Sequence, residues 1–186
     1  MKIALDANLC FLQEKLASLP GVDVCTLPDL DKIDGVMSMD ALLISPISSG
    51  HFKNIIDYCK NLKWVHILGT GVNAFPLELA QDKLITCSRG ATAGPISEWV
   101  LAMMLSFEKQ LPIRKLTAPP KTWYMADLGS LESKTLGLVG FGAIGQAIAR
   151  KALAFDMAVI AKVRTHRKSP MQDVTFEQDF ETLLSK

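Results

Sequence analysis

Hydrophobic residues in the first hundred positions occur in short runs, separated by segments in which they follow helical spacing. The short runs predict strands, and they occupy residues 2–5, 22–26, 41–44, 64–68 and 84–87. Between them, the helical spacing predicts helices over residues 9–19, 51–60 and 76–81. Strands that alternate with helices are typical of an α/β unit, in which helices cover a mostly parallel sheet.

A longer apolar helix opens the second half of the chain. Pro95 suits a first helical turn, where its missing N–H costs nothing, so we expect a helix from Gly94 to about Gln110. Because this helix is apolar almost all round, we expect it to be buried between two layers or at a subunit contact. The remaining pattern predicts strands over 135–139 and 157–163 and helices over 143–155 and 176–186. We therefore divide the chain into two domains, residues 1–95 and residues 96–186.

Composition narrows the class of protein. With 186 residues, 49% of them hydrophobic and 21% charged, the chain has the material for a buried core. The 20 Lys and Arg residues nearly balance the 19 Asp and Glu residues and form no block of like charge, which argues against nucleic-acid binding. The longest apolar run, residues 99–105, is far shorter than the ~20 residues that cross a bilayer, so no membrane span is predicted.

The cysteines carry no metal-site or disulfide signature. They stand at positions 10, 25, 59 and 87 without a C-x-x-C pair or a neighbouring histidine. This spacing argues against a structural zinc site or a redox dithiol, so we expect no bound metal and interpret each cysteine as a small hydrophobe. Because nothing marks secretion, we expect a reducing, cytoplasmic location.

A glycine-rich segment between a predicted strand and a predicted helix carries the clearest chemistry. It is Gly140-Phe141-Gly142-Ala143-Ile144-Gly145, which fits the pattern G-x-G-x-x-G. In a dinucleotide site the first glycine permits a tight turn, the second lets backbone N–H groups approach a pyrophosphate, and the third lets the helix pack closely on the strand. The anion then lies at a helix N-terminus, where unpaired N–H groups favour negative charge.

The residues on either side of the glycines distinguish a dinucleotide loop from a purely structural glycine turn. Leu136, Leu138 and Val139 precede the loop as apolar strand residues, and Ile148 and Ala152 follow it at helical spacing. The dinucleotide fingerprint requires this strand, turn and helix in this order. The segment therefore favours dinucleotide binding over the structural turn.

Three segments together resemble the D-isomer-specific 2-hydroxyacid dehydrogenases. Residues 131–145, which include the glycine loop, look like the nucleotide-binding core of that family. Gly69-Thr70-Gly71-Val72-Asn73 resembles its substrate-domain loop, and residues 88–100 resemble the segment that leads into its interdomain helix. The resemblance covers nearly the whole chain, and the three segments stand in the family's order.

This resemblance implies a flavodoxin-like substrate domain followed by a Rossmann domain, whose sheet is doubly wound and parallel. It also implies hydride transfer between NAD(P) and C2 of a small 2-hydroxy acid, with an Arg and a His held by an acidic residue as the catalytic groups. In the family these groups follow the third and later strands of the nucleotide domain. We therefore expect them beyond Lys186, predict an incomplete Rossmann domain and assign no catalytic residue in this sequence.

Some residues invite a catalytic role but have simpler explanations. His66 lies inside an apolar strand and is interpreted as a core residue, while His51 and His166 are interpreted as surface residues. Arg89 precedes the interdomain helix, at a position where the family has a loop lining the cleft. We therefore expect Arg89 to contact substrate or to pack within that loop rather than to catalyse.

The resemblance also implies a substrate-binding loop. Thr70, Gly71 and Val72 match the loop whose backbone N–H groups receive the substrate carboxylate in the family, which is a small anion nest of fixed dipoles. The alternative is a tight glycine turn after a strand, and the sequence leaves both open.

The position expected to bind the adenosine ribose favours NADP over NAD. The fingerprint expects an acidic residue about 20 positions after the glycines, and the resemblance places Val163 there. A valine cannot accept the ribose hydrogen bond, and it removes a negative charge that would repel a 2′-phosphate. Arg164, Thr165, Arg167 and Lys168 follow, and a guanidinium can hold a phosphate through two hydrogen bonds. NAD, with the basic residues merely solvated, remains the alternative.

The leading hypothesis is an NAD(P)-dependent oxidoreductase of small 2-hydroxy or 2-oxo acids, which acts as a homodimer. The alternatives are a catalytically silent dinucleotide-binding module or gene fragment, and another two-domain Rossmann enzyme such as a relative of alanine dehydrogenase. We also expect the strand 136–139 to be unpaired on one side, and the chain alone to bind nucleotide weakly.

Overall fold

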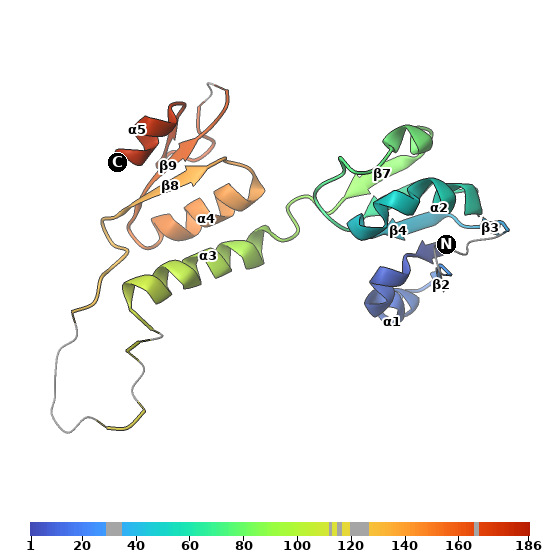
Figure 1. Ribbon diagram of the computed structural model, residues 1–186, viewed down its shortest axis with the longest axis horizontal. Coiled ribbons are helices and arrows are strands. Elements are labelled where there is room, and N and C mark those ends of the chain that lie inside the picture. The colour runs from blue at the N-terminus through green and yellow to red at the C-terminus, as the bar shows by residue number, and fades with distance from the viewer. Residues whose placement is uncertain (29–34, 112, 115–116, 120–126, 166–167) are drawn as a thin grey trace. The chain divides into compact units, whose positions relative to one another are not determined.

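The computed structural model describes residues 1–28, 35–111, 113–114, 117–119, 127–165 and 168–186. These residues form two compact units, Met1–Arg89 and Gly90–Lys186 (Figure 1). The division falls just before the long helix, so residues 90–95 pack with the second unit.

The first unit contains a parallel sheet of five strands in the order β2-β1-β4-β6-β7. Its strands are β1 (Lys2–Leu5), β2 (Asp23–Thr26), β4 (Ala41–Ile44), β6 (Trp64–Ile67) and β7 (Leu84–Cys87). A separate parallel pair joins β3 (Met37–Ser38) to β5 (Cys59–Lys60). The five-stranded order is the flavodoxin-like one, in which the chain reverses direction across the sheet between β1 and β4.

Both faces of this sheet are buried because helices cover each of them. The 3-10 helix η1 (Ala7–Leu12) and α1 (Gln13–Ala17) cover one face, where Leu5, Leu43 and Leu9 share a core. The other core joins Ile44 to Phe52. That face is covered by η3 (Pro46–His51), α2 (Phe52–Tyr58) and η4 (Leu77–Ala80). All four residues of β4 are buried, as expected of a central parallel strand.

The second unit contains three parallel strands in the order β10-β9-β8, which is the order of the first half of a Rossmann sheet. The strands are β8 (Thr135–Val139), β9 (Ala158–Lys162) and β10 (Val174–Glu177). The helices are α3 (Ala93–Glu108), α4 (Ala143–Leu153) and α5 (Phe180–Leu184).

The helices of the second unit cover opposite faces of its sheet. Helices α3 and α4 lie side by side (Figure 1), and Leu101 and Ile148 from these helices share a core with Leu138 of β8. Gly137, the intervening residue of β8, points the other way, and a Cβ there would lie 3.5 Å from Leu183 of α5. Successive strand residues point to opposite faces, so α5 covers the face opposite α3 and α4.

The structure confirms the predicted α/β class and corrects several predicted elements. The strands over 2–5, 41–44, 84–87 and 135–139 form as expected. The helix predicted over 176–186 is wrong, because Val174–Glu177 pairs with β9 and the helix begins only after Asp179. The Asp179 carboxylate accepts a hydrogen bond of 2.7 Å from the Thr182 N–H, which caps that helix.

Two helices of the first unit are shorter than expected. The segment predicted as one helix over 9–19 forms η1 and α1, which ends at Ala17, and Leu9 within η1 has φ −112° and ψ 15°, outside the helical region. The helix predicted over 51–60 ends at Tyr58, because Cys59 and Lys60 extend to pair with β3. Hydrogen bonds to a neighbouring strand therefore override the helical spacing of these residues.

Strand β8 stands at an edge of the sheet formed by the described residues, where it pairs only with β9. The side chain of Val139 at its end is 72% exposed. This arrangement agrees with the one-sided pairing expected from the sequence. Among the described residues, no helix is long and apolar enough to cross a membrane.

Candidate functional site

The glycine loop begins where β8 ends, at the carboxyl edge of the sheet in the second unit. Gly140 has φ +100°, a backbone conformation that side chains rarely adopt. Its N–H donates a 3.0 Å hydrogen bond to the carbonyl of Lys162, the last residue of β9. The turn therefore starts while the chain is still attached to the neighbouring strand.

The third glycine lies against the first. A Cβ on Gly145 would lie 2.6 Å from the Gly140 carbonyl oxygen, which no real side chain tolerates. A Cβ on Gly142 would meet nothing within 4 Å, so this glycine faces open space. The loop thus contains one glycine needed for φ, one needed for close packing, and one beside an open approach to the backbone. These are the geometric roles that the sequence predicted for the three positions.

Helix α4 begins at Ala143, directly after the open position at Gly142. Gly142 is its N-cap residue, with no side-chain hydrogen bond at that cap, and Ala143 and Ile144 form the exposed start of the helix. The first N–H groups of a helix have no partner within the helix and favour an anion. Phe141 points the other way, being 4% exposed, with its ring 5.0 Å from that of Phe176 in an edge-to-face contact. Phe141 thus anchors the loop to the core rather than facing an approaching ligand.

The basic segment begins at the same edge of the sheet, at the end of β9. Val163 is buried and donates its N–H to the Glu177 carbonyl at 3.0 Å, whereas Arg164 and Thr165 are exposed. Since β8 and β9 are adjacent and parallel, these residues follow the strand next to the glycine loop. Arg167 lies outside the described residues.

An acidic side chain also belongs to this edge. Glu177, the last residue of β10, accepts hydrogen bonds of 2.7 and 3.1 Å from the backbone N–H groups of Gln178 and Asp179. These two bonds hold the pKa of the Glu177 carboxyl below its usual value. The carboxylate is therefore ionised at neutral pH and is already bonded to its own loop.

The predicted substrate loop follows β6 in the first unit. Thr70 and Gly71 are exposed, whereas Val72 is half-buried and packs against the core beside α2. The Val72 carbonyl accepts a 3.0 Å hydrogen bond from Phe75 N–H, which closes the loop. Two exposed residues are thus presented on a closed turn at the carboxyl edge of the sheet.

His66 is hydrogen-bonded on both ring nitrogens. Nδ1 lies 2.8 Å from Thr86 Oγ1, and Nε2 lies 3.1 Å from Ser88 Oγ. Trp64 Nε1 also donates to Thr86 Oγ1 at 2.8 Å, so the cluster joins β6 to β7. Burial lowers the pKa of His66 from its ordinary value. These contacts agree with the sequence-based interpretation of His66 as a satisfied structural residue.

A polar cluster around the buried side chain of Asp6 lies at the same edge of the first unit and was not predicted from the sequence. Asp6, Asn8 and Ser45 follow β1 and β4 and are joined by hydrogen bonds. The signal available in the sequence was polar residues directly after two apolar strands. Such residues come together at the carboxyl edge when the strands are parallel and adjacent, as β1 and β4 are.

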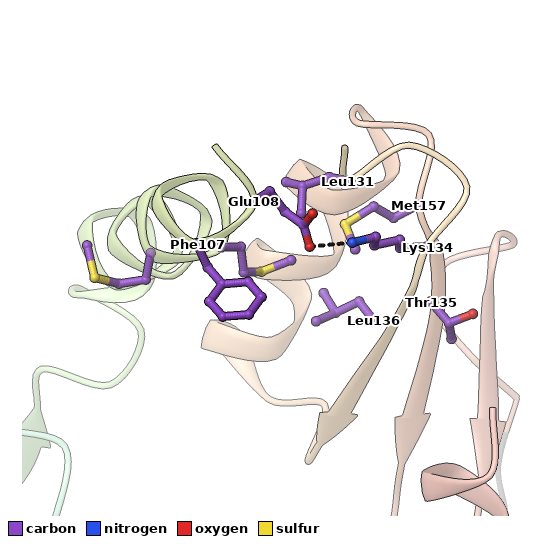
Figure 2. A pocket seen from close by; sticks show the side chains of 9 residues that line it. Phe107, Glu108, Leu131, Lys134, Thr135, Leu136 and Met157 are labelled. Carbon is purple, nitrogen blue, oxygen red and sulfur yellow. Dashed lines mark hydrogen bonds and ion pairs between the residues drawn. The ribbon is translucent and has the colours of Figure 1, made fainter. Parts of the chain in front are cut away.

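The pocket in Figure 2 lies elsewhere, near the start of β8 rather than its end. It has a volume of about 410 Å³. Apolar side chains from α3 and β8, including Phe107 and Leu136, line it, and an ion pair between Glu108 and Lys134 stands beside them. The candidate nucleotide site is the exposed glycine loop at the opposite end of the strand, and this pocket is separate from it.

Comparisons with known proteins show which family the chain is similar to. Residues 101–186 match the family described as "D-isomer specific 2-hydroxyacid dehydrogenase, NAD binding domain". A hydroxypyruvate reductase of Thermotoga maritima is 35% identical over 112 residues, which cover 58% of this chain and 37% of that protein. A glyoxylate reductase of Thermococcus litoralis is 26% identical over 166 residues, which cover 83% of this chain and 50% of that protein. The chain thus spans about half the length of these relatives or less.

Solved structures show the same fold. An NADPH-dependent glyoxylate/hydroxypyruvate reductase from Sinorhizobium meliloti matches 98% of this chain and 59% of its own, with a TM-score of 0.70 and 19% identity. An NAD-dependent formate dehydrogenase from Staphylococcus aureus matches 98% of this chain and 62% of its own, with a TM-score of 0.59 and 18% identity.

These matches confirm the resemblance inferred from the three sequence segments. The second unit is similar to the NAD-binding domain of the D-isomer-specific 2-hydroxyacid dehydrogenases, and the chain is similar to a glyoxylate reductase over most of its length.

Two substitutions within the glycine loop test whether Gly145 is needed for close packing while Gly142 is not. We expect Gly145→Ala to lower the free energy of unfolding of the second unit by about 1–3 kcal/mol, as overpacking does, because its Cβ meets the Gly140 carbonyl. Gly142→Ala is the matched control, since its Cβ enters open space, and it leaves that free energy unchanged. Urea unfolding followed by circular dichroism measures both. Equal effects of the two variants would contradict the packing role of Gly145.

A second prediction concerns pH and His66. Because burial lowers the pKa of folded His66 from 6.5, the unfolded chain binds this proton more readily. The contribution of neutral His66 to stability is therefore present above about pH 6.5 and is lost as the pH falls from there through the lower pKa of the folded protein. We expect His66→Gln to reduce the loss of stability between about pH 7 and about pH 5, measured by urea unfolding. Parallel stability curves for the two proteins would show that His66 is not responsible.

Proposed function

We propose that the chain forms the substrate-binding and nucleotide-binding parts of an oxidoreductase. This enzyme transfers a hydride between NAD(P) and a small 2-hydroxy or 2-oxo acid, with specificity for the D-isomer. The observation that carries the proposal is the strand, glycine loop and helix of the second unit, where Gly140 turns the chain, Gly145 packs on it and Gly142 faces open space. The named relatives that reduce glyoxylate or hydroxypyruvate support the same class of reaction.

The loop suits a dinucleotide because its backbone is accessible where the pyrophosphate would lie. A Cβ at residue 142 would occupy that space, which explains the glycine. In this proposal residues 140–145 hold the pyrophosphate, and Arg164 and Thr165 lie toward the adenosine ribose; Arg167 is assigned to the same group from the sequence alone. The nicotinamide supplies the hydride chemistry when bound, and the protein contributes binding and orientation.

The first domain, residues 1–95, is proposed to hold the acid, and the second, residues 96–186, the nucleotide. The exposed turn at Thr70 and Gly71, closed by Val72, offers backbone N–H groups to a carboxylate. A cytoplasmic location belongs to the same proposal. It is supported by the four cysteines, which form no disulfide in the structure, as is usual in a reducing compartment.

The functional experiment is titration with NADPH and NADH, followed by the fluorescence of the nicotinamide. We expect saturable binding, reduced about tenfold or more by Gly142→Ala, whose Cβ would occupy the pyrophosphate position. Oxidation of NADPH in the presence of glyoxylate or hydroxypyruvate, assayed on the protein that contains this chain, tests the reaction. Nucleotide binding without turnover of any 2-oxo acid would favour a silent dinucleotide-binding module, and absence of binding would contradict the proposal.

We further propose a preference for NADP over NAD. Val163 offers no acceptor for the ribose, while the exposed guanidinium of Arg164 follows the strand next to the glycine loop. The similar solved structures include one NADPH-dependent and one NAD-dependent enzyme, so the support comes from these residues.

Arg164→Ala tests this preference. A charged hydrogen bond contributes about 1.5–3 kcal/mol, so we expect the Kd for NADPH to rise about tenfold or more. The Kd for NADH should stay unchanged, because NADH lacks the 2′-phosphate. Arg150→Ala is the matched control, since it removes the same charge from an exposed position in the last turn of α4. Equal or tighter binding of NADH by the unaltered protein would refute the preference.

We also propose a homodimer that buries the exposed apolar side chains of α3. Ile96, Trp99, Met103 and Phe107 lie three or four residues apart, and all are exposed, Phe107 by 83%. A row of exposed apolar side chains along one helix is typical of an interaction surface.

Sedimentation equilibrium tests the dimer. We expect the unaltered protein to be dimeric at micromolar concentration and Phe107→Glu to be monomeric, because burying an unpaired charge in an interface is costly. Phe11→Glu is the control, as Phe11 is also exposed, by 70%, but lies in the first unit. A monomeric unaltered protein, or a dimer that survives Phe107→Glu, would refute this surface.

A further inference from the structure

We propose that Pro46, held in place by the buried carboxylate of Asp6, is a positioning residue for the loop of residues 69–72. The proposal rests on the proposed function, which assigns this loop to the carboxylate of the acid substrate. It adds the residues that determine where the loop lies, and these come from two other strands, β1 and β4.

Asp6 is fully buried, and both of its carboxylate oxygens are hydrogen-bonded. Oδ2 accepts a 2.8 Å bond from the backbone N–H of Ser45, the residue that follows β4. Oδ1 accepts bonds of 3.0 and 3.2 Å from the backbone N–H and side-chain amide of Asn8. Bonds from N–H groups to a buried carboxylate are strong and directional, so Asp6 determines where the chain leaves β4.

The turn that contains Pro46 is held at further points. Ser45 Oγ accepts a 3.3 Å hydrogen bond from the Ile47 N–H, which caps η3. Asn8 Nδ2 also donates to Ser48 Oγ at 3.0 Å, and Ser48 is 1% exposed. The ring of Pro46 restricts its own φ. Pro46 also lies between Ser45 and Ser48, which are hydrogen-bonded to Asp6 and Asn8 in the turn that follows β1.

Gly69 lies directly against this proline. A Cβ on Gly69 would lie 2.6 Å from Pro46 Cγ, although the φ of Gly69 is not in the left-handed region. The glycine is thus required by space and not by backbone conformation. On its other side, the Gly69 carbonyl accepts a 3.0 Å bond from the Ser88 N–H, which follows β7. Residue 69 is therefore held between Pro46 and Ser88, immediately before Thr70 and Gly71.

This contact bears on ligand binding because the proposed carboxylate site consists of backbone N–H groups. Such groups cannot adjust by changing rotamer, so their position depends on whatever holds the loop. Hydrogen bonds weaken steeply with poor geometry, and a displacement of the loop therefore weakens several of them together. Pro46 does not touch the proposed ligand in this scheme and acts only through Gly69.

A double-mutant cycle tests the contact. We expect Gly69→Ala to lower the Tm and to raise the Kd for pyruvate about tenfold, which corresponds to about 1.4 kcal/mol. Adding Pro46→Ala removes Cγ, makes room for the new methyl group and restores most of the Tm and of the affinity. Gly50→Ala is the matched control within η3, since its Cβ meets nothing within 4 Å, and we expect it to resemble the unaltered protein.

The readout is the shift of the backbone amide resonances of residues 70–72 on titration of the full chain with pyruvate. Pyruvamide, which lacks the negative charge, serves as the control ligand. Pro46→Ala alone introduces no steric clash, so we expect the fold to stay intact and the Tm to be nearly unchanged. We expect the loop to be less firmly held and pyruvate binding to be severalfold weaker. A purely structural role for Pro46 would not change the affinity in this way.

The outcomes separate the two proposals. If Pro46→Ala fails to rescue Gly69→Ala, or alone leaves pyruvate binding unchanged, the positioning role is overturned whatever the loop binds. If the Tm shows the coupling but residues 70–72 of the unaltered protein do not respond to pyruvate, or respond equally to pyruvamide, the proposed carboxylate site is wrong. The contact between Pro46 and Gly69 would then remain as packing alone, and the positioning role would fall with the site.

Discussion

The second unit depends on the distance between two residues of one loop. Gly145 lies so close to the Gly140 carbonyl that a single methyl group would displace one of them. This approach sets the start of α4 beside the end of β8, and α4 in turn presents Ile148 to the core shared with Leu138. The open backbone at Gly142 follows from the same constraint, because the helix can begin there only if the turn is this tight. The proposed nucleotide binding and the folding of the second unit therefore place demands on the same few atoms.

A similar constraint operates in the first unit with different chemistry. There a glycine at 69 approaches a proline ring instead of a carbonyl group, and a buried carboxylate, Asp6, holds that ring in place. Both loops lie at the carboxyl edge of a parallel sheet, where neighbouring strands end together and their following turns meet. Ligand sites in open α/β sheets occur at this edge for that reason. The two units thus use glycine in the same manner, to leave room for an atom that lies where a Cβ would be.

Local pattern predicted the strands well, because short apolar runs between turns have few other stable arrangements. It failed where pairing partners decided the outcome. Val174–Glu177 carries enough apolar residues for either a helix or a strand, and only the neighbouring β9 selects the strand. Cys59 and Lys60, which were predicted to be helical, form a strand for the same reason, because they pair with β3. The contacts of Asp6 with Ser45 and of Pro46 with Gly69 could not be predicted from the local pattern either. In both pairs the two residues are distant in sequence and meet only after the sheet forms.

The sequence by itself determined the alternation of strands and helices, the glycine loop and the family resemblance, because these depend on residues that are neighbours along the chain. The tertiary structure alone decided which turns meet. The sheet order places Val163 and Arg164 beside the glycine loop. Parallel pairing also places Pro46 against Gly69 and joins His66 to Thr86 on the neighbouring strand. These contacts depend on strand order and register, which are set by burying both faces of a sheet and not by any local run of residues.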